Sequence, residues 1–147
     1  MQQRTIQVPS EALVLAQHFE GLFLKPYRCP AGVPTIGYGH VIPSMAHPPI
    51  TKAQAVAFLD SDMAVAVAGA LRYCPKLIHD QRKLAAVADF VFNLGAGRLR
   101  ISTLRRRINE EDWKEAAREL SKWVWGGGKK LPGLILRRKA ESLLLCN

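Results

Sequence analysis

The stretch EGLFLKPYRCPAGVPTIGYGH, residues 20–40, decides the fold of this chain. Ahead of it, apolar residues at helical spacing predict an amphipathic helix over residues 10–20, with Ser10 as its N-cap. Gly21 follows at once, at the position where helices commonly end in a left-handed residue. Glu20 therefore belongs to the last turn, at the edge of the apolar face. Partial burial there favours the protonated carboxyl that a general acid requires.

The second half of the stretch predicts a short, strongly turned β-hairpin. Glycines and prolines alternate with apolar residues over residues 27–40. Cys29 lies nine residues after Glu20, and Thr35 lies six residues after Cys29. The helix and the hairpin therefore place the Glu20 carboxyl, the Cys29 thiol and the Thr35 hydroxyl at fixed spacing.

This spacing resembles the catalytic region of phage-type lysozymes, the endolysins of glycoside hydrolase family 24. Their pattern is Glu, eight residues, Asp, five residues, Thr, and then IGYGH or a close variant; here Cys29 stands where the family usually has Asp. The resemblance implies an α+β, mainly helical, lysozyme-like fold in a single domain spanning all 147 residues. A small β-hairpin lobe over residues 21–50 would be joined by a long helix over residues 51–74 to a helical lobe formed by residues 10–20 and 75–147.

Further helices follow from hydrophobic periodicity. Thr51 and Gln54 have capping-box spacing at the start of the long helix. Asp80 is placed to cap the next helix, whose apolar residues recur at i, i+3, i+4, i+7 and i+8 and predict a core helix. A later helix is expected to be capped near Asn109, and Pro132 is expected to start the last one.

The family resemblance continues through DFVFNLGAG, residues 89–97, and the segment that contains Ser102 and Thr103. It implies that Asn93 and the two hydroxyl groups hydrogen-bond sugar substituents, while Phe92 forms an apolar wall. His40, at the end of the IGYGH segment, is assigned to substrate binding on the same resemblance. Helix-ending turn chemistry accounts equally well for Asn93.

The run WVWGGGKKLPGLILRRKAE, residues 123–141, resembles the C-terminal segment of the same family. A guanidinium matches a carboxylate bidentately, so Arg137 or Arg138 is a candidate to pair with Glu20 and orient it. The competing pairing joins one of them to Glu141 on the same helix. We assign Arg137 to the substrate site.

Composition limits the partners. A net charge of +9 and a pI near 9.9 favour polyanions, such as an anionic cell-envelope surface. No helix-turn-helix, zinc finger or aromatic-basic RNA motif is evident, so nucleic acid is not expected. The four histidines lack helical metal-ligand spacing, so neither a metal nor another cofactor is expected.

The same sequence predicts where the protein is made. Three cysteines form no disulfide framework, which indicates synthesis in the reducing host bacterial cytoplasm. The longest strictly apolar run is nine residues and the N-terminus lacks signal-peptide features, so we expect no membrane span and no leader. Action on the periplasmic wall then requires release by another protein, a holin. We expect a monomer.

The resemblance implies hydrolysis of the β-1,4 bond between N-acetylmuramic acid and N-acetylglucosamine in peptidoglycan. Glu20 would protonate the leaving oxygen, and a water assisted by Thr35 would attack with inversion. Cys29 has three interpretations: a thiolate that activates water or attacks the sugar, a neutral space-filler, or an inert thiol in a poorly active wall-binding protein. Alternatives to hydrolysis are a lytic transglycosylase using Glu20 alone and a basic wall-, membrane- or nucleic-acid-binding protein without turnover.

Overall fold

The structure, a computed structural model, describes residues 6–147, so the first five residues of the expected leaderless N-terminus lie outside it. Seven α-helices and one short 3-10 helix occur in this part of the chain: α1 Ser10–Glu20, α2 Lys52–Tyr73, η1 Pro75–His79, α3 Gln81–Leu94, α4 Ala96–Arg100, α5 Thr103–Asn109, α6 Trp113–Leu120 and α7 Pro132–Cys146. The strands are β1 Phe23–Arg28, β2 Pro34–Gly37, β3 His40–Val41, β4 Trp125–Gly126 and β5 Lys129–Lys130.

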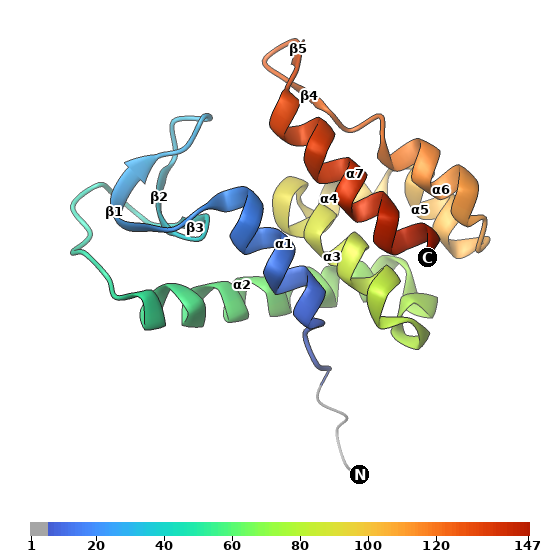
Figure 1. Cartoon of the computed structure of the whole chain (residues 1–147), viewed down its shortest axis with the longest axis horizontal. Helices are drawn as coiled ribbons and strands as arrows, with labels where there is room; N and C mark the ends of the chain where they lie inside the picture. The colour runs from blue at the N-terminus through green and yellow to red at the C-terminus, as the bar shows by residue number, and fades with distance from the viewer. Residues whose placement is uncertain (1–5) are drawn as a thin grey trace.

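The elements gather into two lobes (Figure 1). The strands β1, β2 and β3 lie at one end, most of the helices lie at the other, and the long helix α2 runs beneath and joins them. This arrangement confirms the predicted mainly helical α+β, lysozyme-like fold. The hairpin lobe contains one strand more than the predicted hairpin, because β3 pairs with β2 through Thr35↔Val41 and Ile36↔His40.

The ends of α1 place the predicted acid. Gly21 closes the helix with φ of +73°, and its amide donates to the Gln17 carbonyl, so Glu20 is the last helical residue as predicted. The predicted cap at Ser10 is wrong, because Ser10 is already helical and Pro9 occupies the N-cap position without a side-chain cap. A cap near Asn109 is also wrong for α6, because the Asp112 carboxylate accepts from the Glu115 amide there.

Helix α2 begins at the predicted capping box. The Gln54 amide donates to the Thr51 hydroxyl at 3.1 Å, and the Thr51 amide donates to the Gln54 side chain at 2.8 Å. By length and composition α2 could cross a membrane, with a mean hydropathy of 1.3. Its buried residues instead pack in the interior, which is the behaviour of a core helix: Ala55, Leu59, Met63, Ala66, Val67 and Ala70.

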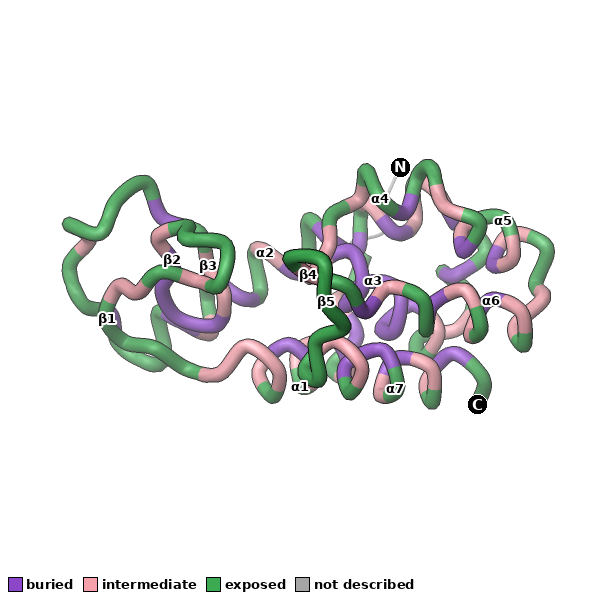
Figure 2. The backbone as a smooth tube through the Cα atoms, turned by 90° about the horizontal axis from the view of Figure 1, so that it is seen from above, coloured by how far each residue is buried: buried purple, intermediate pink, exposed green. Residues whose placement is uncertain are grey.

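The main core lies in the helical lobe around α3. Every residue from 84 to 91 is buried, including the acid Asp89. Figure 2 shows buried backbone concentrated along α3 and its neighbours, whereas much of β1 and the loops of the hairpin lobe is exposed. The hairpin lobe therefore has little core of its own and depends on packing against α2 for its position.

One side-chain contact ties the hairpin lobe to α2. The His40 Nδ1 atom lies 2.7 Å from Asp62 Oδ2, and the imidazole stacks on the Phe58 ring with 4.2 Å between centroids. His40 is thus engaged by two residues of α2. Its predicted role in substrate binding stays a prediction.

We predict that Asp62→Asn lowers the free energy of unfolding by about 1–2 kcal/mol, because the imidazole loses its charged acceptor. Chemical denaturation at neutral pH measures the change. Asp60→Asn is the matched control, since Asp60 is exposed on the same helix and should change stability by less than about 0.5 kcal/mol. Equal effects of the two substitutions would show that the His40–Asp62 contact does not stabilise the fold.

Candidate active site

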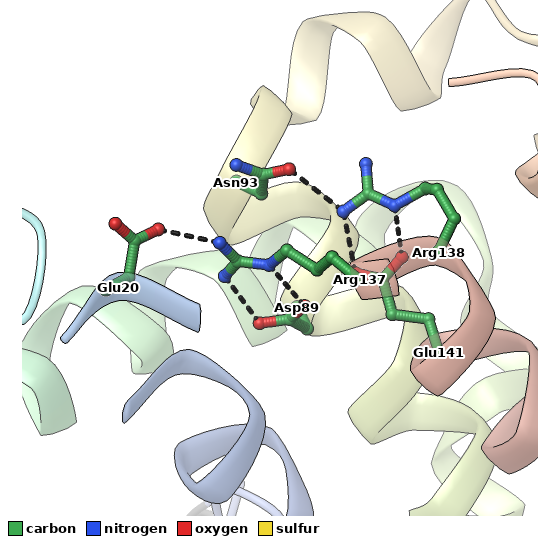
Figure 3. Close-up of polar contacts among 6 residues, drawn as sticks. All are labelled: Glu20, Asp89, Asn93, Arg137, Arg138 and Glu141. Carbon is green, nitrogen blue, oxygen red and sulfur yellow. Dashed lines mark hydrogen bonds and ion pairs between the residues drawn. The ribbon is translucent and has the colours of Figure 1, made fainter. Parts of the chain in front are cut away.

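The Glu20 carboxyl lies at the end of α1, next to Gly39 of the hairpin lobe, with 23% of its side chain exposed. Its Oε1 atom accepts a hydrogen bond from Arg137 Nη1 at 2.8 Å, across 117 residues of sequence. The other oxygen points away from the arginine (Figure 3). One carboxylate oxygen is therefore fixed, and Oε2 is left to face the hairpin.

Gly39 makes room for that second oxygen. A Cβ atom on Gly39 would lie 2.8 Å from Glu20 Oε2, closer than carbon and oxygen atoms pack, and the residue has φ of +74°. Both the position and the backbone conformation exclude a side chain here. The glycine before His40 in the IGYGH segment thus has a steric role beside the acid.

Arg137 is itself anchored from the opposite side. Its Nε and Nη2 atoms donate to the two oxygens of Asp89, each at 2.8 Å, and its side chain is only 5% exposed. Burial alone would raise the pKa of Asp89, but the hydrogen bonds and charge of Arg137 outweigh it and hold that pKa below its ordinary value. The guanidinium thus bridges a carboxylate on α3 and one on α1.

Both arginine pairings considered from the sequence occur, one for each arginine. Arg138 forms an ion pair with Glu141, with 2.6 Å between Nε and Oε1, and its Nη2 donates to the Asn93 side chain at 2.9 Å. The Asn93 amide oxygen is therefore occupied by Arg138. Its predicted contact with sugar is left to its amide nitrogen.

Cys29 and Thr35 lie on the β1–β2 hairpin, where Cys29 is half-buried and Thr35 is buried. Backbone contacts with Val33, Ala31 and Gly32 lower the pKa of the Cys29 thiol against a smaller effect of burial. The Thr35 hydroxyl has a single proton, which here it donates to the Val33 carbonyl at 2.8 Å. The pKa of Cys29 thus lies below its ordinary value, and the role of the thiol in the reaction stays a prediction.

Tyr27 connects the two reactive groups electrostatically. Burial raises the pKa of the Tyr27 hydroxyl, and the charges of Glu20 and Cys29 raise it further. That Glu20 and Cys29 act in one site stays a prediction.

The remaining predicted substrate residues divide between two cavities. His40 and Phe92 line one of about 390 Å³, together with Gly39. Ser102 and Thr103 line another of about 520 Å³, together with Trp123 and Trp125. The Ser102 hydroxyl is also the N-cap of α5, accepting from the Arg105 amide at 3.0 Å.

The sequence alone did not predict a role in the site for Asp89 or Gly39. Asp89 is an acid within an otherwise apolar helical stretch, a signal that predicts a buried partner of opposite charge. The sequence predicted Gly39 only as a turn residue. Its place next to His40 in the IGYGH family motif was the signal that it has a role in the site. In residues 6–147 no group of three or more His, Cys, Asp or Glu side chains is arranged to hold a metal ion.

Comparison with known proteins identifies the family of this arrangement. The family model described as phage lysozyme matches residues 17–141, which includes the acid, the thiol and both arginines. The chain belongs to the phage lysozyme family. It is accordingly a glycoside hydrolase of the lysozyme type.

Individual relatives agree with this assignment. The chain is 39% identical over 143 residues to the endolysin of Acyrthosiphon pisum secondary endosymbiont phage 1, covering 95% of this chain and 97% of that protein. It is 37% identical over 126 residues to the SAR-endolysin of bacteriophage PS119, covering 83% of this chain and 73% of that one. Among solved structures, the muramidase domain of SpmX from Asticaccaulis excentricus is 28% identical, with a TM-score of 0.83 and coverage of 97% and 99%.

We predict that Gly39→Ala lowers kcat by roughly 100-fold. The new methyl group would push the Glu20 carboxyl out of its position, and a displacement of about 1 Å is enough for a loss of this size. Gly128→Ala is the matched control: Gly128 also has positive φ, of +79°, but nothing lies within 4 Å of its added Cβ. Turbidity clearing by the two purified variants, at equal folded concentration, gives the comparison. Equal losses would assign the effect to backbone strain rather than to the acid.

Proposed function

We propose that this chain is an endolysin that hydrolyses the β-1,4 bond between N-acetylmuramic acid and N-acetylglucosamine, with Glu20 as the general acid. The observation that carries the proposal is the half-buried carboxyl with one oxygen bound by Arg137 and the other free. A proton on Oε2 would be delivered to the leaving glycosidic oxygen. Arg137 fixes the carboxyl so that this oxygen faces the substrate.

Cys29 supplies the second half of the reaction as a thiolate. Backbone amides around the turn favour its ionised form, which supports this interpretation over a neutral space-filler or an inert thiol. The thiolate accepts a proton from a water that the Thr35 hydroxyl helps to hold, and the water attacks the anomeric carbon with inversion. Attack by the sulfur itself is the variant of this step that would give retention.

Two cavities supply the proposed sugar-binding surface. His40 and Phe92 line one together with Gly39, which lies beside the Glu20 carboxyl, and Ser102 and Thr103 line a separate one together with Trp123. Indole and phenyl rings suit the apolar faces of sugar rings, and the hydroxyl groups suit their N-acetyl and hydroxyl substituents. The net charge of +9 favours an anionic envelope.

We also propose where the protein is made and how it reaches the wall. Three unpaired thiols, at Cys29, Cys74 and Cys146, fit synthesis in the host cytoplasm. A holin would release the folded monomer to the periplasmic wall.

We predict that Glu20→Gln abolishes turbidity clearing of outer-membrane-stripped Gram-negative cells, while sedimentation with purified wall persists. The amide keeps a carbonyl acceptor for Arg137 but has no proton to donate at neutral pH. Glu11→Gln, on the first turn of the same helix, is the control and should clear cells as the parent does. Clearing by Glu20→Gln would overturn the assignment of the acid.

We predict that iodoacetamide at neutral pH alkylates Cys29 before Cys146, and that lysis is lost in step with the first label. Cys146 is the exposed internal control, whereas burial raises the pKa of Cys74 to about 11 and protects it. Activity needs the thiolate, so the acidic limb of its pH profile should follow the Cys29 pKa, which lies below the ordinary 9.0. Peptide mass spectrometry assigns the label; near-normal lysis by Cys29→Ser would contradict the thiolate role.

A further inference from the structure

A group of arginines lies on the surface formed by α4 and α5. The segment RLRISTLRRR, residues 98–107, holds five arginines and no acidic residue. Figure 2 shows α4 and α5 along one edge of the helical lobe, with α7 along the opposite edge. Arg100, Arg105 and Arg106 line one open hollow of about 430 Å³ here, together with Ile101. We call these four residues the α4–α5 basic surface.

Arg105 makes this surface part of the rigid fold. Its Nε atom donates to the Tyr73 carbonyl at 3.0 Å, and its Nη1 atom donates to the Arg100 carbonyl at 3.1 Å. Its guanidinium also lies over the Tyr73 ring, 4.9 Å from the centroid. The Arg72 guanidinium lies over the same ring at 5.5 Å and brings a further positive charge beside the surface. One arginine therefore joins the end of α2 to α4 and α5.

The other two arginines of the surface have no anionic partner. Arg100 and Arg106 are exposed, and within residues 6–147 the side chain of neither forms an ion pair. Glu110 also lines the hollow, but its carboxylate accepts from Arg107 at 3.1 Å. Like charges held close together repel, so this arrangement costs stability in the protein alone. Binding of an anion would relieve the repulsion.

An exposed apolar side chain lies within the same surface. Ile101 follows Arg100 directly and is 77% exposed. A single exposed apolar residue is common on proteins, but cations around one are typical of surfaces that bind anionic membranes. There the lipid phosphates pair with the cations, and the apolar side chain enters the boundary of the acyl chains. Guanidiniums suit this role because they bind phosphate oxygens bidentately.

We propose that the α4–α5 basic surface docks the protein on an anionic phospholipid membrane. Arg100 and Arg106 pair with lipid phosphates, and Ile101 enters the interface between them. The net charge of +9 predicts an anionic partner but not where it binds, and this surface supplies the place. Docking needs no reaction at Glu20, so it goes beyond the proposed function and does not depend on it.

A nucleic acid fits this surface less well. Proteins that bind single strands offer aromatic side chains on which bases stack, and residues 98–107 contain none. The neighbouring Tyr73 ring is already in contact with two guanidiniums. Ile101 would also remain in water beside a phosphate backbone. A layer of phosphates with an apolar layer beneath it matches both kinds of side chain.

Co-sedimentation with vesicles of phosphatidylglycerol and phosphatidylethanolamine tests the proposal. The parent should bind these vesicles and should bind phosphatidylcholine vesicles only weakly. Raising the salt concentration should weaken binding, because salt screens exposed charges. Each basic residue near an anionic membrane strengthens binding about fivefold, so Arg100→Gln combined with Arg106→Gln should weaken it roughly 25-fold.

The matched control removes the same two charges elsewhere on the chain. Lys52→Gln combined with Arg82→Gln changes exposed residues at the starts of α2 and α3. This protein should bind the anionic vesicles within about twofold of the parent. Equal weakening in the two double variants would overturn the proposal, because net charge alone would then account for binding.

A second variant tests the apolar contact. Ile101→Ser keeps every charge, so it should weaken vesicle binding roughly 10-fold while leaving the salt dependence as in the parent. Ile101 also lines the cavity of Ser102 and Thr103, so this variant is compared by vesicle binding alone. Unchanged affinity in Ile101→Ser, with displacement of the protein from vesicles by inorganic phosphate at constant ionic strength, would show a simple phosphate site and contradict membrane docking.

A gel shift with duplex DNA distinguishes the other polyanion. The two double variants should shift DNA equally, if they shift it at all, because the proposal gives the surface no role in that binding. Loss of the DNA shift in the Arg100→Gln, Arg106→Gln protein, with unchanged vesicle binding, would assign the surface to nucleic acid and overturn the proposal.

Docking and hydrolysis can fail separately. Glu20→Gln should bind anionic vesicles as the parent does. The Arg100→Gln, Arg106→Gln protein should digest purified peptidoglycan within about twofold of the parent rate, because neither arginine lines the cavities assigned to sugar. A parent that binds anionic vesicles without digesting peptidoglycan would reject the proposed function and leave the docking surface standing. Digestion without vesicle binding would reject the docking surface alone.

Discussion

The buried guanidinium of Arg137 is the interaction on which the rest of the site depends. It joins α7 to carboxylates on α3 and α1 at the same time, all at 2.8 Å. Removing a guanidinium from water is costly, and only full pairing offsets that cost. The charge therefore selects the one packing of these three helices in which both carboxylates reach it. The proposed general acid, Glu20, is thus positioned from the far end of the chain.

The hairpin lobe has little core of its own, yet it must hold its reactive groups opposite Glu20. Its position is fixed by α2, through packing and through the His40–Asp62 contact. Gly39 allows the lobe to approach Glu20 more closely than any other residue would permit. Backbone contacts in the turn that carries Cys29 lower the pKa of its thiol. Close approach and a favoured thiolate follow from the same glycine-rich sequence.

Local features of this fold could be predicted from the sequence. The end of α1 at Gly21, the capping box at Thr51 and the cap at Asp80 each depend on residues a few positions apart. The spacing of Glu20, Cys29 and Thr35 identified the family for the same reason. The predicted N-cap at Ser10 was wrong by one residue, because the N-cap is Pro9. Sequence patterns do not locate the end of a helix to a single residue.

Long-range features could not be predicted in the same way. The pairing of Arg137 with Asp89 joins residues 48 apart, and nothing local distinguishes Arg137 from Arg138 as the partner of Glu20. The choice is made by the helix packing, which turns one arginine to α1 and the other to Glu141 and Asn93. Strand β3 was missed because it is only two residues long, His40 and Val41, too short for an alternating pattern.

The central claim is that Glu20 protonates the leaving oxygen while a water completes the cleavage, with Cys29 in place of the usual acid. Digestion of purified peptidoglycan in H₂¹⁸O, followed by mass spectrometry of the released muropeptides, tests this most directly. Attack by water predicts reducing ends that carry one ¹⁸O atom at the anomeric carbon of N-acetylmuramic acid. Products with 1,6-anhydro ends and no ¹⁸O would show intramolecular attack and contradict it.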